Sequence, residues 1–171
     1  LLAIQAAFDK MPPLTPNRNV MVNAAGSALI VASGVNAVST PWSPVITAAT
    51  PGDLTVVYNT QSGDIVRVQG IVVIRFEIIT STFTHTTASG NLLITGIPVA
   101  PANGIAYGTL AFSGVTKATY TQFTTNVNSG AVQATILASG TGVAVATVAI
   151  TDLPTGGTVH LKGSLMYGVT G

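Results

Sequence analysis

The chain has very few charged residues and no cysteine. Six Lys and Arg and five Asp and Glu make up 6% of its 171 residues, whereas about a quarter of the residues are charged in an average soluble domain. The absence of cysteine excludes disulfides, thiolate catalysis and cysteine-ligated metal sites. The net charge is +1 and the basic residues are scattered singly. We therefore expect no nucleic-acid partner, because phosphate binding needs a clustered basic surface.

The few charges are unevenly distributed along the chain. Residues 19–52 and 118–151 contain no charged side chain, and Thr, Ser, Asn and Gly stand where Lys and Glu are usual. Interfaces between protein subunits are depleted of charge at their centres. We therefore expect parts of these stretches, namely the extended residues up to 52 and the run 143–150, to lie between subunits of an oligomer. The outer, solvated face would then be marked by the remaining charges, namely Arg67, Arg75, Glu77 and Lys162.

Long hydrophobic runs are also missing, although 47% of the residues are hydrophobic. The nearest approach to a membrane span is the segment 20–38, which Asn23, Ser27, Gly34 and Asn36 interrupt. A helix of that composition would expose polar groups to lipid. We therefore expect no membrane insertion.

Residues 1–12 have the spacing of a short coiled-coil helix. Leu1, Ile4, Phe8 and Met11 follow one another at intervals of three, four and three residues, and two prolines then end the segment. So short a helix does not hold together alone in water. It either packs against its own domain or forms the end of an oligomeric stalk, and we favour the stalk.

The rest of the chain divides into an extended connector, residues 13–52, and a β-rich head, residues 53–171. Three prolines between 41 and 51 exclude a central strand in the connector. In the head, short apolar runs alternate with Gly, Asn and Pro at roughly ten-residue spacing, and no run has a helical period. These features predict a mainly β fold, an antiparallel β-sandwich of the jelly-roll type.

Two of the expected strands carry specific predictions. In the run 72–79 the even positions are apolar, and Arg75 and Glu77 share the opposite face, where they can pair. The run 143–150 is apolar on both faces. Such a strand is either central in a sandwich or faces another subunit.

A third of the chain, residues 42–98, carries a recognisable order of motifs. A Trp-x-Pro opening and a Thr-Pro-Gly linker are followed by a strand that ends in Tyr and by two glycines separated by six residues. A long strand, a Ser/Thr-rich loop and Gly-Asn-Leu-x-Ile-x-Gly-Ile-Pro come next. This order resembles a module of tailed-phage tail fibres, tailspikes and head fibres, with differences at Ile65 and Val99, where the module commonly has an aromatic residue and Phe. The matching positions are Trp42, Pro44, Pro51, Gly52, Tyr58, Gly63, Gly70, Gly90, Asn91, Leu92, Ile94, Gly96 and Pro98.

The resemblance implies a virion appendage protein with a homotrimeric β-sandwich head at the end of a fibre. Its N-terminal region would bind other virion structural proteins, and the molecule would lie on the surface of the phage particle. The resemblance supplies no catalytic residue and no cofactor. A looser similarity to the trimeric jelly rolls of the complement and tumour-necrosis-factor type is confined to residues 63–78 and concerns architecture alone.

Each candidate catalytic or metal-binding residue has a simpler structural interpretation. Gly52-Asp53 and Gly63-Asp64 are typical of turns in which Asp hydrogen-bonds its own backbone, whereas a glycosidase needs two carboxylates that flank a cleft. The two histidines, His85 and His160, fall short of the three converging ligands of a zinc site. A ring of either histidine at a trimer axis is the remaining way to bind an ion. The hydrolase elbow, phosphate loop and metalloprotease motifs are missing, so we expect no enzymatic activity, cofactor or metal.

Binding of a ligand is better supported than catalysis. The segments 85–91 and 126–129 are expected to be polar loops at strand ends, where β-sandwiches usually contact their ligands. Aromatic rings surrounded by Asn, Thr and Ser are suited to sugars. Trp42, by contrast, is expected to pack at an interface. The candidate ligand-binding residues are His85, Thr86, Thr87, Asn91, Tyr107, Asn126 and Asn128.

The sequence therefore predicts a phage virion fibre protein whose trimeric head attaches the particle to the host surface. The partner on the host would be a glycan or a protein. The alternative is a purely structural head fibre or capsid decoration protein, in which residues 1–50 make the contacts and the head has no receptor. An enzymatic tailspike is a distant third possibility.

Overall fold

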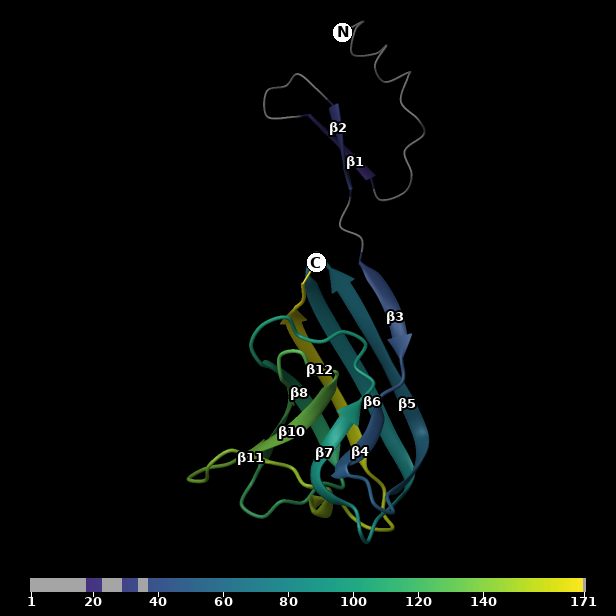
Figure 1. Ribbon diagram of the computed structural model, residues 1–171, viewed down its shortest axis with the longest axis vertical. Coiled ribbons are helices and arrows are strands. Elements are labelled where there is room, and N and C mark those ends of the chain that lie inside the picture. The colour runs from purple at the N-terminus through teal and green to yellow at the C-terminus, as the bar shows by residue number, and fades with distance from the viewer. Residues whose placement is uncertain (1–17, 23–28, 34–36, 171) are drawn as a thin grey trace, which may run out of the picture. The chain divides into compact units, whose positions relative to one another are not determined.

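The computed structural model describes residues 18–22, 29–33 and 37–170, and the chain divides into two compact units, Leu1–Ala37 and Val38–Gly171. In the first unit β1 (Arg18–Val22) and β2 (Leu29–Ser33) form a two-stranded antiparallel sheet, with Val20 opposite Val31. The stalk helix predicted for residues 1–12 lies outside the described residues. The second unit, called the head below, holds the remaining strands (Figure 1).

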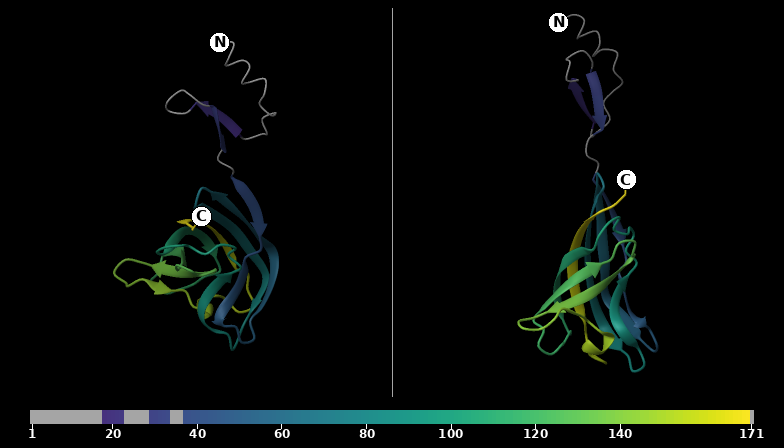
Figure 2. Two further views of the ribbon diagram at one scale, coloured as in Figure 1. Left: turned by 45° about the horizontal axis from the view of Figure 1, so that its top comes forward. Right: turned by 60° about the vertical axis from the view of Figure 1, so that its left-hand side comes forward.

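The head is one antiparallel sheet with the strand order β3-β5-β6-β12-β8-β9-β10-β7-β4, and a short β11 pairs with β10. A single turn of 3-10 helix, η1 (Ile150–Asp152), precedes the last strand. The described part of the head is thus mainly β, and the sheet is curled, consistent with the predicted sandwich-like fold (Figures 1 and 2). The strands are β3 (Val38–Trp42), β4 (Val45–Thr50), β5 (Thr55–Val68), β6 (Ile71–Thr84), β7 (Ser89–Thr95), β8 (Ala106–Ser113), β9 (Gln122–Val127), β10 (Gln133–Ser139), β11 (Ala146–Thr147) and β12 (His160–Gly168).

The long hairpin of β5 and β6 is the backbone of the head. Gln69 and Gly70, the two residues between these strands, both have positive φ, at 45° and 81°. Two such residues are what a primed two-residue turn requires, and this turn matches the right-handed twist of the strands it joins. The even positions of β6 from Val72 to Ile78 are buried, as the alternation predicted, and they pack on the buried odd positions of β12.

Both ends of the curled sheet meet at the link between β3 and β4. These two strands are the sheet edges, and only Ser43 and Pro44 separate them in sequence. Side chains of β5 connect across the gap, because the Tyr58 hydroxyl accepts a hydrogen bond from Ile46 N at 2.9 Å and Gln61 Nε2 donates to Pro44 O at 3.0 Å. The inner faces of all the long strands, together with those of β4, β7 and β10, form a single core.

The compact head begins earlier than the expected boundary at residue 53. Residues 38–50, which the sequence analysis assigned to the connector, form β3 and β4, and these pair with β5 and β7. The prolines did exclude a central position, since both strands lie at sheet edges. Edge strands tolerate proline because one side of the strand needs no hydrogen-bond partner.

The run 143–150 is not a long strand in the centre of a sandwich, which was the first of the two interpretations of its apolar pattern. A contact of this run with another subunit, the second interpretation, stays a prediction. Only Ala146 and Thr147 form a strand, at the margin of β10, and Val145 is 64% exposed. Val148 donates its N–H to Ile136 O, and the chain then turns into η1, where the Asp152 carboxylate accepts the N–H of Ala149. Val148 and Ile150 are fully buried because they fill the core at this turn and not because they alternate along a strand.

Candidate functional site

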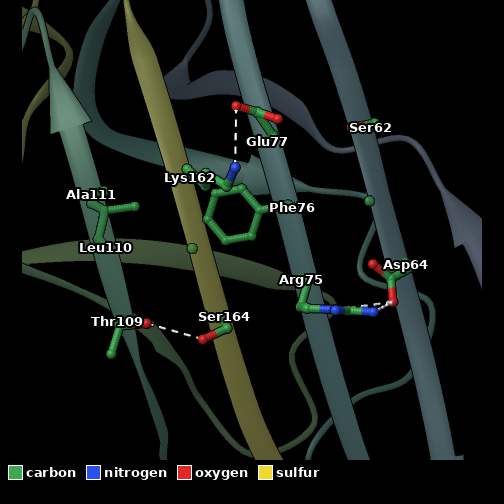
Figure 3. Close-up of a pocket in the computed structure, with 12 residues that line it drawn as sticks. Ser62, Asp64, Arg75, Phe76, Glu77, Thr109, Leu110, Ala111, Lys162 and Ser164 are labelled. Atoms are coloured by element: carbon green, nitrogen blue, oxygen red, sulfur yellow. Dashed lines mark hydrogen bonds and ion pairs between the residues drawn. The ribbon is translucent and has the colours of Figure 1, made fainter.

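The outer face of β5, β6, β12 and β8 is hollowed by a groove of about 720 Å³. Its lining combines charged and hydroxyl side chains with small residues, and Figure 3 shows how these project from the four neighbouring strands. We refer to this hollow as the groove. The side chains that define it are Asp64, Arg75, Glu77, Thr109, Lys162 and Ser164.

The register of the sheet arranges these side chains in two rows. In the first row, Asp64 lies opposite Arg75, which in turn lies opposite Ser164 and then Thr109. In the second row, Ser62, Glu77, Lys162 and Ala111 face one another in the same order. Because alternate residues of a strand point to the same face, the two rows are neighbours on the outer surface.

Each carboxylate of the groove is paired with a cation from an adjacent strand. Arg75 Nη2 and Nε donate to Asp64 Oδ2 at 2.8 and 3.2 Å. Glu77 Oε1 lies 3.5 Å from Lys162 Nζ and 3.3 Å from His160 Nε2. The pairing of Arg75 with Glu77 proposed from the sequence is therefore replaced by pairs across strands. Asp64 also lies within β5, and not at the turn that Gly63-Asp64 suggested.

The groove holds half of the charge of the head. Only eight Asp, Glu, Lys and Arg side chains lie between residues 38 and 171, and four of them line the groove. Arg75 and Lys162 are well exposed, with 65% and 61% of their side-chain surface accessible. In a chain that avoids charge almost everywhere, this concentration of both signs on one surface is the strongest chemical feature of the head.

Small residues and buried aromatic rings support the floor of the groove. A side chain at Gly63 would collide with the Trp42 ring, and one at Gly163 would collide with the Phe76 ring, both of which pack from the core side. Trp42 Nε1 also donates to Arg75 O at 3.3 Å, so the indole holds the backbone of β6 beneath the groove. Trp42 thus packs within its own domain in the described structure, with 8% of its surface exposed.

The predicted loop residues Thr86 and Thr87 are organised by Asp53. The Asp53 carboxylate accepts hydrogen bonds from the backbone N–H and the hydroxyl of both threonines and from Ala88 N. The Thr86 hydroxyl, followed by the N–H groups of Thr86 and Thr87, holds the pKa of Asp53 well below its usual range. Asp53 therefore orders a loop distant in sequence, where the sequence analysis expected it to bind its own turn.

The other candidates near this loop make internal contacts. His85 stacks edge-on against Phe83 and has its Nε2 atom 3.4 Å from Leu153 O. Asn91 Oδ1 accepts a hydrogen bond from the Thr147 hydroxyl at 2.9 Å. Both side chains are half-buried, so these two residues contribute to joining β6 and β7 to the segment 147–153.

Tyr107, Asn126 and Asn128 lie at the other end of the strands. Tyr107 of β8 is opposite Asn126 of β9, and 59% of the Tyr107 surface is exposed. Asn126 is buried and its Oδ1 accepts a hydrogen bond from the Thr135 hydroxyl at 3.1 Å, whereas Asn128 is exposed. The seven candidates thus form two separate groups, and none of them lines the groove.

The described part of the chain was searched for a cluster of metal ligands and for a membrane-spanning helix. Within those residues no three His, Asp, Glu or Cys side chains converge as metal ligands, and no helix is long and apolar enough to cross a bilayer.

No protein-family model matches the chain, and no curated protein matches it in sequence. Its fold does match part of a solved structure, that of the Dettilon tailspike protein, with a TM-score of 0.57 and 15% sequence identity over 78% of this chain. The match spans only 24% of the length of the tailspike. At this identity the likeness establishes a shared fold. Tailspikes are also one of the classes of protein that the motifs of residues 42–98 resemble.

Proposed function

We propose that this chain is part of a phage tail fibre or tailspike and that its head attaches the virion to the surface of the host cell. The observation that carries the proposal is the fold shared with a tailspike over 78% of the chain. The motifs of residues 42–98 support it independently, since they were identified from sequence. The groove is the site on the head best suited to contact a ligand, because its charges are exposed and lie in a hollow.

The working form of the molecule is proposed to be a homotrimer. Apolar side chains gather on the outer face of the head at the end where β3 begins. Val66, Val73 and Met166 lie opposite one another on three adjacent strands, and Val68 and Ile71 form the next row. We call these five residues the entry-end rows. Met166 is 66% exposed and Ile71 is 48% exposed, and contiguous exposed apolar residues usually mark a protein contact.

A second copy of this chain is the partner that suits the entry-end rows. Val38, where the chain enters the head, pairs with Arg67 beside these rows. Copies held together by residues upstream of Val38 would therefore meet at this end of the head. Three weak ligand sites in one trimer would bind a cell surface with an avidity well above that of a single site.

The test is to measure the mass of the purified full chain by light scattering and then its binding to bacterial cells. The fluorescently labelled chain is applied to a panel of strains that includes the phage's host, and bound label is counted by cytometry. We expect a trimer that stains a subset of strains. A trimer that stains none would favour the structural head fibre or decoration protein, and a stable monomer would contradict the assembly.

A further inference from the structure

We infer that the groove recognises a saccharide through an anionic substituent, which Arg75 and Lys162 bind together with the Ser164 hydroxyl. The inference rests on the proposed attachment function and names the class of ligand that this site would take. The shared chemistry is a carboxylate or phosphate carried by a sugar. Three observations support it, namely the unused donors of the two cations, their placement around Ser164, and the free acceptors beside them.

The two cations of the groove keep most of their hydrogen-bonding capacity. A guanidinium has five N–H donors, and in the described structure Arg75 uses Nε and Nη2 on a single oxygen, Asp64 Oδ2. The Lys162 ammonium is 3.5 Å from Glu77 Oε1, which is long for a charge-assisted hydrogen bond. Both heads are exposed, so an incoming anion can reach them without displacing a buried group.

Ser164 neighbours both cations on the same face. It is two residues from Lys162 on β12 and directly opposite Arg75 on β6. Arg75 and Lys162 are therefore diagonal neighbours on adjacent strands. Diagonal neighbours lie about 7–8 Å apart, a distance that long side chains can span to reach one ligand.

Ser164 Oγ is 3.0 Å from Thr109 Oγ1, so the hydroxyl pair extends the polar surface onto β8. In Figure 3 the Arg75 guanidinium points to Asp64, the Lys162 ammonium to Glu77 and the Ser164 hydroxyl to Thr109. Rotation of the two long, flexible side chains would bring both cations to a ligand bound over Ser164.

The neighbouring carboxylates favour a sugar over a simple ion. Asp64 and Glu77 each use one oxygen, Oδ2 and Oε1, for all the contacts that the structure describes. Their second oxygens can accept hydrogen bonds from sugar hydroxyls. The two positive and two negative charges cancel, which disfavours a polyanion such as nucleic acid. A ligand with one negative charge and several hydroxyl groups satisfies both halves of this arrangement.

The experiment measures dissociation constants of the full chain for glucuronate, glucose 6-phosphate, glucose and inorganic phosphate by NMR titration. We expect the two anionic sugars to bind, and their affinity to fall as the salt concentration is raised. Glucose and phosphate should bind at least about tenfold more weakly, because glucose lacks the charge-assisted contact and phosphate lacks the contacts of the sugar hydroxyls. The relative affinity of glucuronate and glucose 6-phosphate identifies the preferred anion. Equal binding of glucose would overturn the role of the anion, and equal binding of phosphate would overturn the role of the sugar.

Variants locate the site. Lys162→Gln and Ser164→Ala should each weaken glucuronate binding, the former by about tenfold. Arg67→Gln is the matched control, because it removes one exposed positive charge of the head outside the groove. Loss of binding in the control, or no loss in Lys162→Gln, would contradict the assignment.

Cell binding separates this inference from the function on which it rests. If Lys162→Gln abolishes glucuronate binding and reduces staining of the host, both stand. If the chain stains host cells but binds no anionic sugar, the groove assignment is wrong and attachment is retained. If it binds the sugar but no host strain, attachment is wrong and the groove assignment is retained.

Discussion

The two halves of the head differ in chemistry although they share one core. We call β3, β5, β6, β8 and β12 the long-strand half, after β5, β6 and β12, which are the longest strands of the head. The short-strand half consists of β4, β7, β9, β10 and β11. Every charged side chain on a strand of the head belongs to the long-strand half. The strands of the short-strand half carry only apolar and uncharged polar side chains, chiefly Thr and Ala.

This difference shows that the low charge of the chain is local rather than general. Hydrophobic burial and backbone pairing hold the short-strand half together without ionic side chains. Four of the five charged residues on the strands of this half lie on its outer face, in the groove, and they contribute little to stability because exposed ion pairs are weak. Their concentration is therefore better explained by recognition than by folding.

The largest expected effect concerns assembly. Replacing Ile71 and Met166 of the entry-end rows by lysine places two positive charges at the proposed contact between copies. We expect the trimer to dissociate to monomers in light scattering, because the charges cannot be desolvated there. Val132→Lys with Val145→Lys is the matched control in the short-strand half, since these two side chains are 56% and 64% exposed. Dissociation by the control pair alone would place the contact in the uncharged stretch 118–151, as the sequence suggested.

The next effect concerns the junction of the halves, where β8 pairs with β9. A side chain at Gly108 would collide with the Ser164 carbonyl, Thr125 Oγ1 and Leu165. Gly108→Val should therefore lower the free energy of unfolding by about 3 kcal/mol, as overpacking does. Ser113→Val on the exposed end of the same strand should change it by less than about 0.5 kcal/mol. Urea titrations measure both, and equal stability of the two variants would refute the close approach at Gly108.

A smaller effect is expected from the loop that Asp53 orders, and it depends on pH. The low pKa of Asp53 in the folded head, caused by its hydrogen bonds to Thr86 and Thr87, means that ionised Asp53 stabilises the fold. This stabilisation is complete above the usual carboxyl pKa of about 4 and is lost as the pH falls towards the lower folded value. Asp53→Asn should melt below the wild type at pH 7, and the gap should narrow at pH 3 and below. A gap that stays constant would mean that the carboxylate charge is irrelevant.

The smallest expected effect is on the free energy of unfolding, when one buried threonine from each half is replaced by valine. Thr125 Oγ1 in β9 is buried without a hydrogen-bond partner in the described structure, whereas Thr80 Oγ1 in β6 accepts the Val159 N–H at 2.9 Å. Thr125→Val should raise the free energy of unfolding by about 1 kcal/mol, and Thr80→Val should lower it by a similar amount. Thermal unfolding of both variants tests the opposite signs, and a loss of stability in Thr125→Val would reveal a partner for its hydroxyl.

Sequence patterns predicted the strands that alternate cleanly and failed where the chain turns. The alternation of residues 72–79 correctly identified the buried face of β6, and residues 159–167 alternate in the same way along β12. Thr119 has a positive φ of 71°, which interrupts an extended backbone before β9 begins at Gln122. The strand expected from the apolar pattern of residues 143–150 is not formed, because burial at a turn produces the same apolar composition as burial in a strand.

The candidate site was only partly accessible to the same reasoning. Arg75, Glu77 and Lys162 were correctly placed on the outer face, but their partners were not recognised. The same expectation was wrong for Arg67, which lies opposite the buried Val72 and therefore on the core side of the sheet. Asp64 was assigned to a turn because it follows a glycine, and the hydroxyls of Ser164 and Thr109 gave no signal of their own. Their meeting depends on the register of β5, β6, β12 and β8, which joins residues that are far apart in sequence.

Composition and alternation are local properties of the chain. They were sufficient to identify an antiparallel β protein with low charge, and to indicate which residues of its alternating strands lie on a polar face. Because side chains alternate with a period of two, the sequence of a strand determines which face each residue occupies, whichever strands lie beside it. Which strands become neighbours is decided by the closure of the whole sheet around one core. The turn at Gln69-Gly70 places Arg75 beside Asp64. The pairing of β12 with β6 then adds Ser164 and Lys162, so that a few scattered charges form a groove.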